Sequence, residues 1–243
     1  MISNTWRANI AVRTYVNPVP IGCVAWYDAA QITGVISGTG LAQWDDLSGN
    51  ANHAAGVVNP IYQSNQSQTF LPGVSFNGTT QYMRNLALTG TGSATGVTIM
   101  VAGRLPVGIV GNRELVSFRN AAATEVWELR SNGGPALQFV ANGGITSANT
   151  NSGTQGAAYI WTGTYDPPDL QGVTTRMYVS ESLQDVGSDV ATIDLFDIHL
   201  GFRPAADFWN AVVFEILAWK RSLTAQERGT MVQYLKQKWG ITT

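Results

Sequence analysis

The stretch WDDLSGNANHA, which starts at residue 44, gathers two aspartates, two asparagines and one of only two histidines within eleven residues. Carboxylate and amide oxygens are hard ligands of the kind that calcium prefers, so the candidate calcium ligands are Asp45, Asp46, Asn50 and Asn52. The same residues also fit a turn, in which the Asp46 side chain caps backbone amides and Gly49 adopts positive φ. We favour the turn and expect no cofactor, with calcium as the alternative.

Pairs of carboxyl groups are the chemistry of glycoside hydrolysis, since a retaining enzyme needs two of them about 5–5.5 Å apart. Two acids separated by one residue on a strand would share a face and could meet this need. The nearest pairs here are Glu125 with Glu128 and Asp194 with Asp197. Both pairs are spaced by three, so their carboxyls would point to opposite faces. The sequence therefore predicts no catalytic residue and a protein that is not an enzyme.

Nucleophilic catalysis and dinucleotide binding have no better support. His53 and His199 are the only histidines, and no Gly-x-Ser-x-Gly motif accompanies them. The glycine-rich residues 90–96 lack the spacing and the βαβ surroundings of a dinucleotide loop. Cys23 is the only cysteine and lies in an apolar run, which excludes an intrachain disulfide and indicates a buried, unreactive thiol.

Short strands separated by turns must position these side chains. The run VTIMVAGRL places Val97, Ile99, Val101 and Leu105 on one face and Arg104 on the other. Asn-Gly pairs favour tight turns, because both residues tolerate positive φ, and they occur at 77–78, 132–133 and 142–143. Further strands are expected at 135–141, 159–165, 175–181, 198–202 and 212–219. The pattern predicts an all-β domain.

One helix is expected near residues 225–238. Thr224 and Glu227 match a capping box, in which each side chain satisfies a backbone amide of the other residue. Apolar residues then recur at helical spacing, and Gly240 supplies the stop signal.

The composition indicates a surface with few charges. Charged residues make up 12% of the 243 residues, against a usual share of about 25%, and the net charge is −2. Neutral polar surfaces suit sugar hydroxyls and large assemblies, whereas this charge gives no reason to expect nucleic acid or an anionic membrane as a partner. No apolar run reaches the length of a membrane span, and the N-terminal segment lacks the apolar core of a signal peptide.

Three blocks of sequence occur in an order that resembles a known family. The first joins VAWYDA at residues 24–29 to the stretch that starts at residue 44, the second is LPGVSFNGTTQYM at residues 71–83, and the third runs over residues 209–241. Together they are similar to the laminin G-like jelly roll of the concanavalin A-like lectin and glucanase superfamily, as found in phage virion surface proteins. The resemblance covers residues 21–243.

The resemblance implies a jelly-roll sandwich of two antiparallel sheets with a short C-terminal α-helix, and residues 1–20, which lie outside the family pattern, would form an extended N-terminal arm. It also implies that four tryptophans are core residues, namely Trp26, Trp44, Trp209 and Trp219. Glu215 lies between two apolar residues and would be a satisfied structural carboxylate.

Two functions agree with this family. We expect a non-enzymatic virion surface protein, of the capsid decoration or head-fibre type, whose lectin-like domain has host or environmental glycans as candidate ligands. The alternative is a free carbohydrate-binding lectin module of a bacterial extracellular protein. The first reading places the chain on the virion surface and the second places it outside the cell.

Residues 1–20 form a separate segment that ends in NPVP, which favours an extended arm. We expect this arm to anchor the domain to a capsid protein, to another virion protein or to sister subunits, in a homo-oligomer on the particle. The candidate contact residues are Trp6, Arg7, Ile10, Val12, Arg13 and Tyr15.

Overall fold

The structure is a computed structural model of the 243-residue chain. It describes residues 19, 22–90, 96–105, 113–120, 125–131, 137–141, 154, 156–166, 174–188, 195–202 and 208–242, with the backbone alone at 125, 126 and 141. The expected arm, residues 1–20, lies outside this description apart from Val19, which packs against the hydrophobic core.

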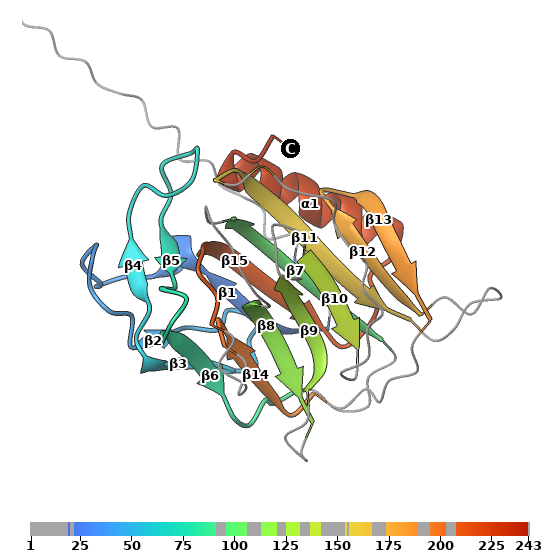
Figure 1. Ribbon diagram of the computed structural model, residues 1–243, viewed down its shortest axis with the longest axis horizontal. Coiled ribbons are helices and arrows are strands. Elements are labelled where there is room, and N and C mark those ends of the chain that lie inside the picture. Colours follow the sequence, from blue (N-terminus) through green and yellow to red (C-terminus); the bar gives the residue numbers. More distant parts are fainter. Residues whose placement is uncertain are drawn as a thin grey trace, which may run out of the picture.

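Two antiparallel sheets form the layers of a sandwich, which confirms the predicted all-β fold (Figure 1). Within the described ranges, sheet A contains β13 (Ser182–Gly187), β12 (Thr175–Val179), β11 (Ala158–Tyr165), β7 (Val97–Arg104), β15 (Val212–Trp219), β5 (Gly73–Ser75) and β4 (Ile61–Gln63), in that order, with β1 (Cys23–Asp28) paired to β15. Sheet B contains β10 (Leu137–Ala141), β9 (Glu125–Ser131), β8 (Arg113–Arg119), β14 (Asp197–Leu200), β6 (Tyr82–Asn85), β3 (Ala54–Val58) and β2 (Gln43–Trp44). A short 3-10 helix, η1 (Ala29–Gln31), follows β1, and the C-terminal helix is α1 (Ala225–Trp239).

Large aromatic side chains fill the space between the sheets. Trp127 of β9 contacts Phe139 of β10, with ring centroids 5.7 Å apart, and Tyr165 of β11 at 4.5 Å. Gly163 lies opposite Phe139, and a Cβ at this position would collide with that ring. The close approach of β10 to β11 therefore requires glycine at residue 163.

The predicted alternation along β7 is confirmed, but the second face of this strand is buried as well. Every residue from Val97 to Gly103 is buried, because β7 lies between β11 and β15 in the middle of sheet A. The segment before α1 covers the outer side, where Leu223 N donates to Thr98 Oγ1 at 3.0 Å. A strand covered on both faces loses the polar alternation of an exposed sheet.

Helix α1 begins and ends as the sequence predicts. Thr224 and Glu227 make both hydrogen bonds of the capping box, and Gly240 adopts the left-handed conformation with φ of 68°. The buried side of α1 packs on the sandwich through Met231, Val232, Leu235 and Trp239. In the part of the chain that the structure describes, no helix is long and apolar enough to cross a membrane.

A buried polar network joins α1 to β1 and β15. Lys238 Nζ donates to Asp28 Oδ2 at 2.5 Å and to Glu215 Oε2 at 2.8 Å. Glu215 also accepts from Trp26 Nε1 at 2.7 Å and from Trp239 Nε1 at 2.8 Å. Burial, reinforced by the negative charge of Asp28, raises the pKa of Glu215 even though Lys238 acts in the opposite direction. Glu215 is thus the satisfied structural carboxylate that the sequence predicted.

The predicted core tryptophans lie in or against the core. Trp44, Trp209 and Trp219 are almost fully buried, and Trp26 is partly buried against the core. Cys23 is also buried, and burial raises the pKa of its thiol to about 12, as expected of an unreactive cysteine.

Candidate functional site

The stretch that starts at residue 44 forms the predicted turn. Asp46 Oδ1 accepts from the backbone amides of Trp26 at 2.8 Å and Ser48 at 3.0 Å. Its Oδ2 accepts from the Asn52 amide at 2.9 Å and from the Ser48 hydroxyl at 2.7 Å. Gly49 has a φ of 90°, as the turn requires. Both oxygens of Asp46 are therefore occupied in holding the loop to β1.

Two of the remaining candidate calcium ligands also hold the loop to β1, whereas the exposed Asp45 accepts from Gln43 Nε2 at 2.6 Å. Asn50 Nδ2 donates to Cys23 O at 3.0 Å, and Asn52 Nδ2 donates to Val24 O at 2.6 Å. His53 Nδ1 accepts from the Asp46 backbone amide at 3.1 Å. Among the described residues, no three His, Cys, Asp or Glu side chains form a group that could hold a metal ion. A calcium ion in this turn would have to displace the amide donors of Asp46.

A second group of polar side chains lies on the face of sheet B that points away from the core. Residues opposite each other on neighbouring strands share a face, as do residues two apart on one strand. The registers of β10, β9, β8, β14 and β6 therefore define this outer face by Gln138, Arg130, Glu128, Glu114, Ser117, Arg119, Asp197, His199, Arg84 and Tyr82. Much of it is buried, and none of Glu114, Ser117, Glu128, Asp197 and His199 exposes more than 4% of its surface.

A β-bulge in β8 corrects one expectation about the acids. Glu114 lies opposite Arg130 and Ser117 lies opposite Glu128, so the register shifts by one residue between them. Glu114 and Glu128 consequently share the outer face although they belong to different strands, while the side chain of Glu125 and residue Asp194 lie outside the described part of the chain. Glu128 Oε2 accepts from Arg130 Nη1 at 2.9 Å, and this ion pair is almost completely buried.

Three residue types that occur in serine hydrolases also meet on the outer face. His199 lies directly opposite Ser117, and Asp197 Oδ2 is 3.5 Å from His199 Nε2. The Ser117 hydroxyl nevertheless makes no hydrogen bond to the ring, and it is fully buried. Nothing in this arrangement activates Ser117 or admits a substrate to it.

Several of these buried polar atoms have no partner in the described part of the chain. They are the Ser117 hydroxyl, Oδ1 of Asp197 and Nδ1 of His199, whereas Nε2 of His199 lies 3.5 Å from Asp197 Oδ2. Leaving a buried polar group without a hydrogen bond costs about 1–3 kcal/mol, so native proteins keep few of them without a functional reason. Because these atoms gather where β8 meets β14, this part of the outer face is a candidate functional region.

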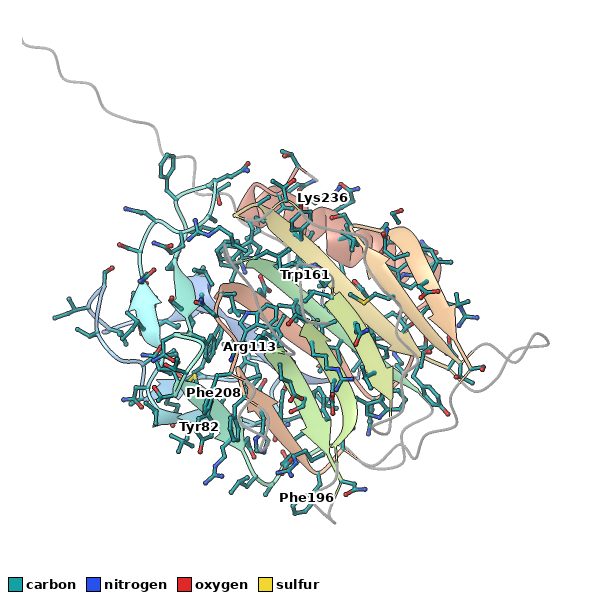
Figure 2. The ribbon with its side chains drawn as sticks, in the orientation of Figure 1. Tyr82, Arg113, Trp161, Phe196, Phe208 and Lys236 are labelled. Carbon is teal, nitrogen blue, oxygen red and sulfur yellow. The ribbon has the colours of Figure 1, made fainter. Side chains whose placement is uncertain are left out.

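An aromatic cluster borders the same junction. The rings of Tyr82 and Phe202 stack with centroids 4.3 Å apart, and Phe208 lies 4.9 Å from Phe202 and 6.2 Å from Tyr82. All three rings are partly exposed and lie outside the hydrophobic core. We call these three residues the aromatic corner; Figure 2 labels two of them, Tyr82 and Phe208, close to Arg113.

Two arginines border the aromatic corner. Arg113 Nη1 donates to the carbonyls of Gly78 at 3.1 Å and Phe208 at 3.3 Å, which fixes the segment that carries Phe208. Arg84 is partly exposed, follows Tyr82 by two residues and lies directly opposite His199. A flat stack of rings beside a guanidinium can bind a ring-shaped ligand that has both an apolar face and polar substituents.

The site residues predicted in the arm, Trp6, Arg7, Ile10, Val12, Arg13 and Tyr15, lie outside the described residues. The asparagine-rich residues 142–156 lie almost entirely outside them as well. Sequence reasoning missed the aromatic corner, because its members come from β6, the end of β14 and the segment before β15. The only signal was an aromatic residue at the end of the Asn-Gly block, at Tyr82.

No protein-family model matches this sequence, and no curated protein matches it either. Solved structures share the fold. A Trypanosoma rangeli sialidase in complex with 2,3-difluorosialic acid is 14% identical with a TM-score of 0.65, over 93% of this chain and 35% of the sialidase. The botulinum neurotoxin serotype D/C binding domain is 14% identical with a TM-score of 0.63, over 90% of this chain and 55% of that chain.

A structure of botulinum neurotoxin type C, which depends on two ganglioside molecules to enter cells, is 12% identical with a TM-score of 0.62. The match covers 88% of this chain and 51% of the neurotoxin chain. This chain therefore spans about a third of the length of the sialidase and about half of the neurotoxin chains. At such low identity the likeness shows the sandwich fold alone.

Proposed function

We propose that this chain is a non-enzymatic glycan-binding module whose ligand site is the aromatic corner. The observation that carries the proposal is the partly exposed stack of Tyr82 and Phe202 outside the core, next to Arg84. The C–H face of a sugar ring packs on an aromatic face, while its hydroxyls need nearby polar groups. The low charge of the chain and a fold shared with a ganglioside-dependent neurotoxin agree with this reading.

The acidic side chains of the outer face favour glycan binding over hydrolysis, because they are either paired or buried. Glu128 is paired with Arg130, and Glu114 and Asp197 expose only 1% and 4% of their surface. A glycosidase must bring two carboxyls to opposite sides of a bound sugar, and buried acids cannot reach one. The aromatic corner, by contrast, is accessible to a ligand.

The biological setting of the module is a separate part of the proposal. We retain the virion surface as its location, with the arm of residues 1–20 as the anchor to a capsid protein, another virion protein or a sister subunit. The free lectin module of a bacterial extracellular protein is the alternative. Deleting residues 2–18 distinguishes them, since a virion protein loses its attachment to the particle whereas a free lectin keeps its binding.

Binding of the purified full chain to a glycan array tests the proposed function. Tyr82→Ala and Phe202→Ala should each weaken binding about 5- to 30-fold, since stacking on one aromatic face contributes roughly 1–2 kcal/mol. Phe70→Ala is the matched control, because Phe70 is an exposed aromatic on the β4–β5 connection of sheet A. Failure to bind any glycan, or equal losses in all three variants, would refute the assignment.

A further inference from the structure

Arg84 differs from the other arginines of the described chain because its guanidinium makes no hydrogen bond or ion pair there. The others are engaged: Arg104 with Gln66, Arg113 with two carbonyls, Arg130 with Glu128, Arg176 with Asp166, Arg221 with Glu227 and Arg228 with Glu181, while Arg119 also has polar interactions. A partly exposed guanidinium without a partner is available to an anionic group.

The strand register explains why no acid neutralises Arg84. On β6 it lies between Ala55 of β3 and His199 of β14, so neither directly opposite residue is a carboxylate. Tyr82 is two residues before it on the same strand and the same face. The nearest acid position on β14 is Asp197, diagonal to Arg84, and its carboxylate lies next to the ring of His199.

The side chains next to Arg84 on the outer face do not pair with it. His199, directly opposite Arg84, is buried with its Nε2 3.5 Å from Asp197 Oδ2, and Ser117 on the far side of His199 is fully buried. His199 stacks near Phe202, with ring centroids 6.2 Å apart. The aromatic corner and the unpaired cation thus meet at one place, where a sugar ring could stack while an anionic substituent reaches Arg84.

On the basis of the proposed function, we infer that the glycan recognised at the aromatic corner carries a carboxylate, as in a sialic acid or a uronic acid. The planar guanidinium of Arg84 matches the two oxygens of a carboxylate with two parallel hydrogen bonds. A carboxylate is attached directly to the pyranose ring of such sugars, so stacking on Tyr82 brings it within reach of the neighbouring position on β6. Neutral sugars would stack but leave Arg84 unpaired.

Matched acidic and neutral glycans test this inference by calorimetry. The probes are sialyllactose against lactose, and an oligogalacturonide against its carboxyl-reduced form. The wild-type chain should bind at least one acidic probe about tenfold or more tighter than its neutral counterpart. Arg84→Gln should abolish this preference, because it lowers the affinity for the acidic probe further than the affinity for the neutral probe, and Arg84→Lys should restore only part of the preference.

Arg104→Gln is the control, because Arg104 is a partly buried arginine on the other sheet. Equal affinity for acidic and neutral probes, or an acidic preference that survives Arg84→Gln in a folded variant, would overturn the inference. If Tyr82→Ala still weakens glycan binding in that case, the proposed function stands without the carboxylate inference. Equally tight, Arg84-dependent binding of a sulfated sugar would also overturn the carboxylate assignment, and no binding of any probe would remove the proposed function itself.

Discussion

Replacing Lys238 by methionine should destabilise the domain strongly at neutral pH. Lys238 is almost fully buried and binds two carboxylates, Asp28 at 2.5 Å and Glu215 at 2.8 Å, which are themselves buried. Removing one member of a buried ion network leaves charge uncompensated and costs about 3–5 kcal/mol. For a domain of this size, that corresponds to a fall in Tm of about 6–20 °C. Urea unfolding at pH 7 would measure the loss directly.

The pH dependence makes this test specific to the network. The pKa of Glu215 is already raised in the folded protein by burial and by Asp28, and the variant also loses the opposing effect of Lys238. Because the folded pKa lies above the unfolded value, the charged form of Glu215 costs stability, and this cost disappears as the pH falls through the folded pKa. The deficit of Lys238→Met should therefore shrink as the pH is lowered from 7.

Lys236→Met is the matched control, since Lys236 also lies in the last turn of α1 but is only partly buried and has no acidic partner in the described chain (Figure 2). We expect a change within about 0.5 kcal/mol for this variant. Equal stability of the two variants at pH 7, or a Lys238→Met deficit that grows on acidification, would refute the reasoning.

Further outcomes concern the helix cap, the turn and catalysis. Glu227→Gln should lower the free energy of unfolding by about 1 kcal/mol at pH 7. The pKa of Glu227 is lowered to about 2, chiefly by Arg221, so its stabilising contribution is fully present above the unfolded value of 4.5 and is lost as the pH falls from there toward 2. Urea unfolding across that pH range would show this loss. Asp46→Ala should destabilise the fold by about 2–4 kcal/mol in thermal unfolding, because it leaves three backbone amides without their acceptor. Asp45→Ala should change the stability little. A Tm that rises with added calcium would instead support the metal site. No reducing sugar should be released from polysaccharides, and turnover that disappears in Glu128→Gln would contradict the non-enzymatic assignment.

Local patterns predicted the elements that depend on neighbours in sequence. The capping box at Thr224 and Glu227 and the stop at Gly240 fix the ends of α1, because their hydrogen bonds join residues a few positions apart. The β15 strand has the predicted bounds, and the Asp46 turn has the predicted hydrogen bonds. Each of these is a short-range feature, for which the residue types suffice.

The candidate site depends on which strands are neighbours, and periodicity along one strand does not contain that information. Glu114 and Glu128 share a face only because of the bulge between Glu114 and Val116. Arg84 meets His199 only because β6 pairs with β14, whose sequence lies more than a hundred residues away. Acid pairs sought along single strands could not reveal this face.

The position of a bound glycan on the domain decides whether the aromatic corner is the ligand site. A crystal structure of the chain with the tightest binder from the array should place a sugar ring over Tyr82 and Phe202, on the outer face of sheet B. A ligand in the hollow of about 350 Å³ lined by Ser75, Arg104 and Asn210 at the ends of the sheet A strands would contradict the account, as would one at the Asp46 turn.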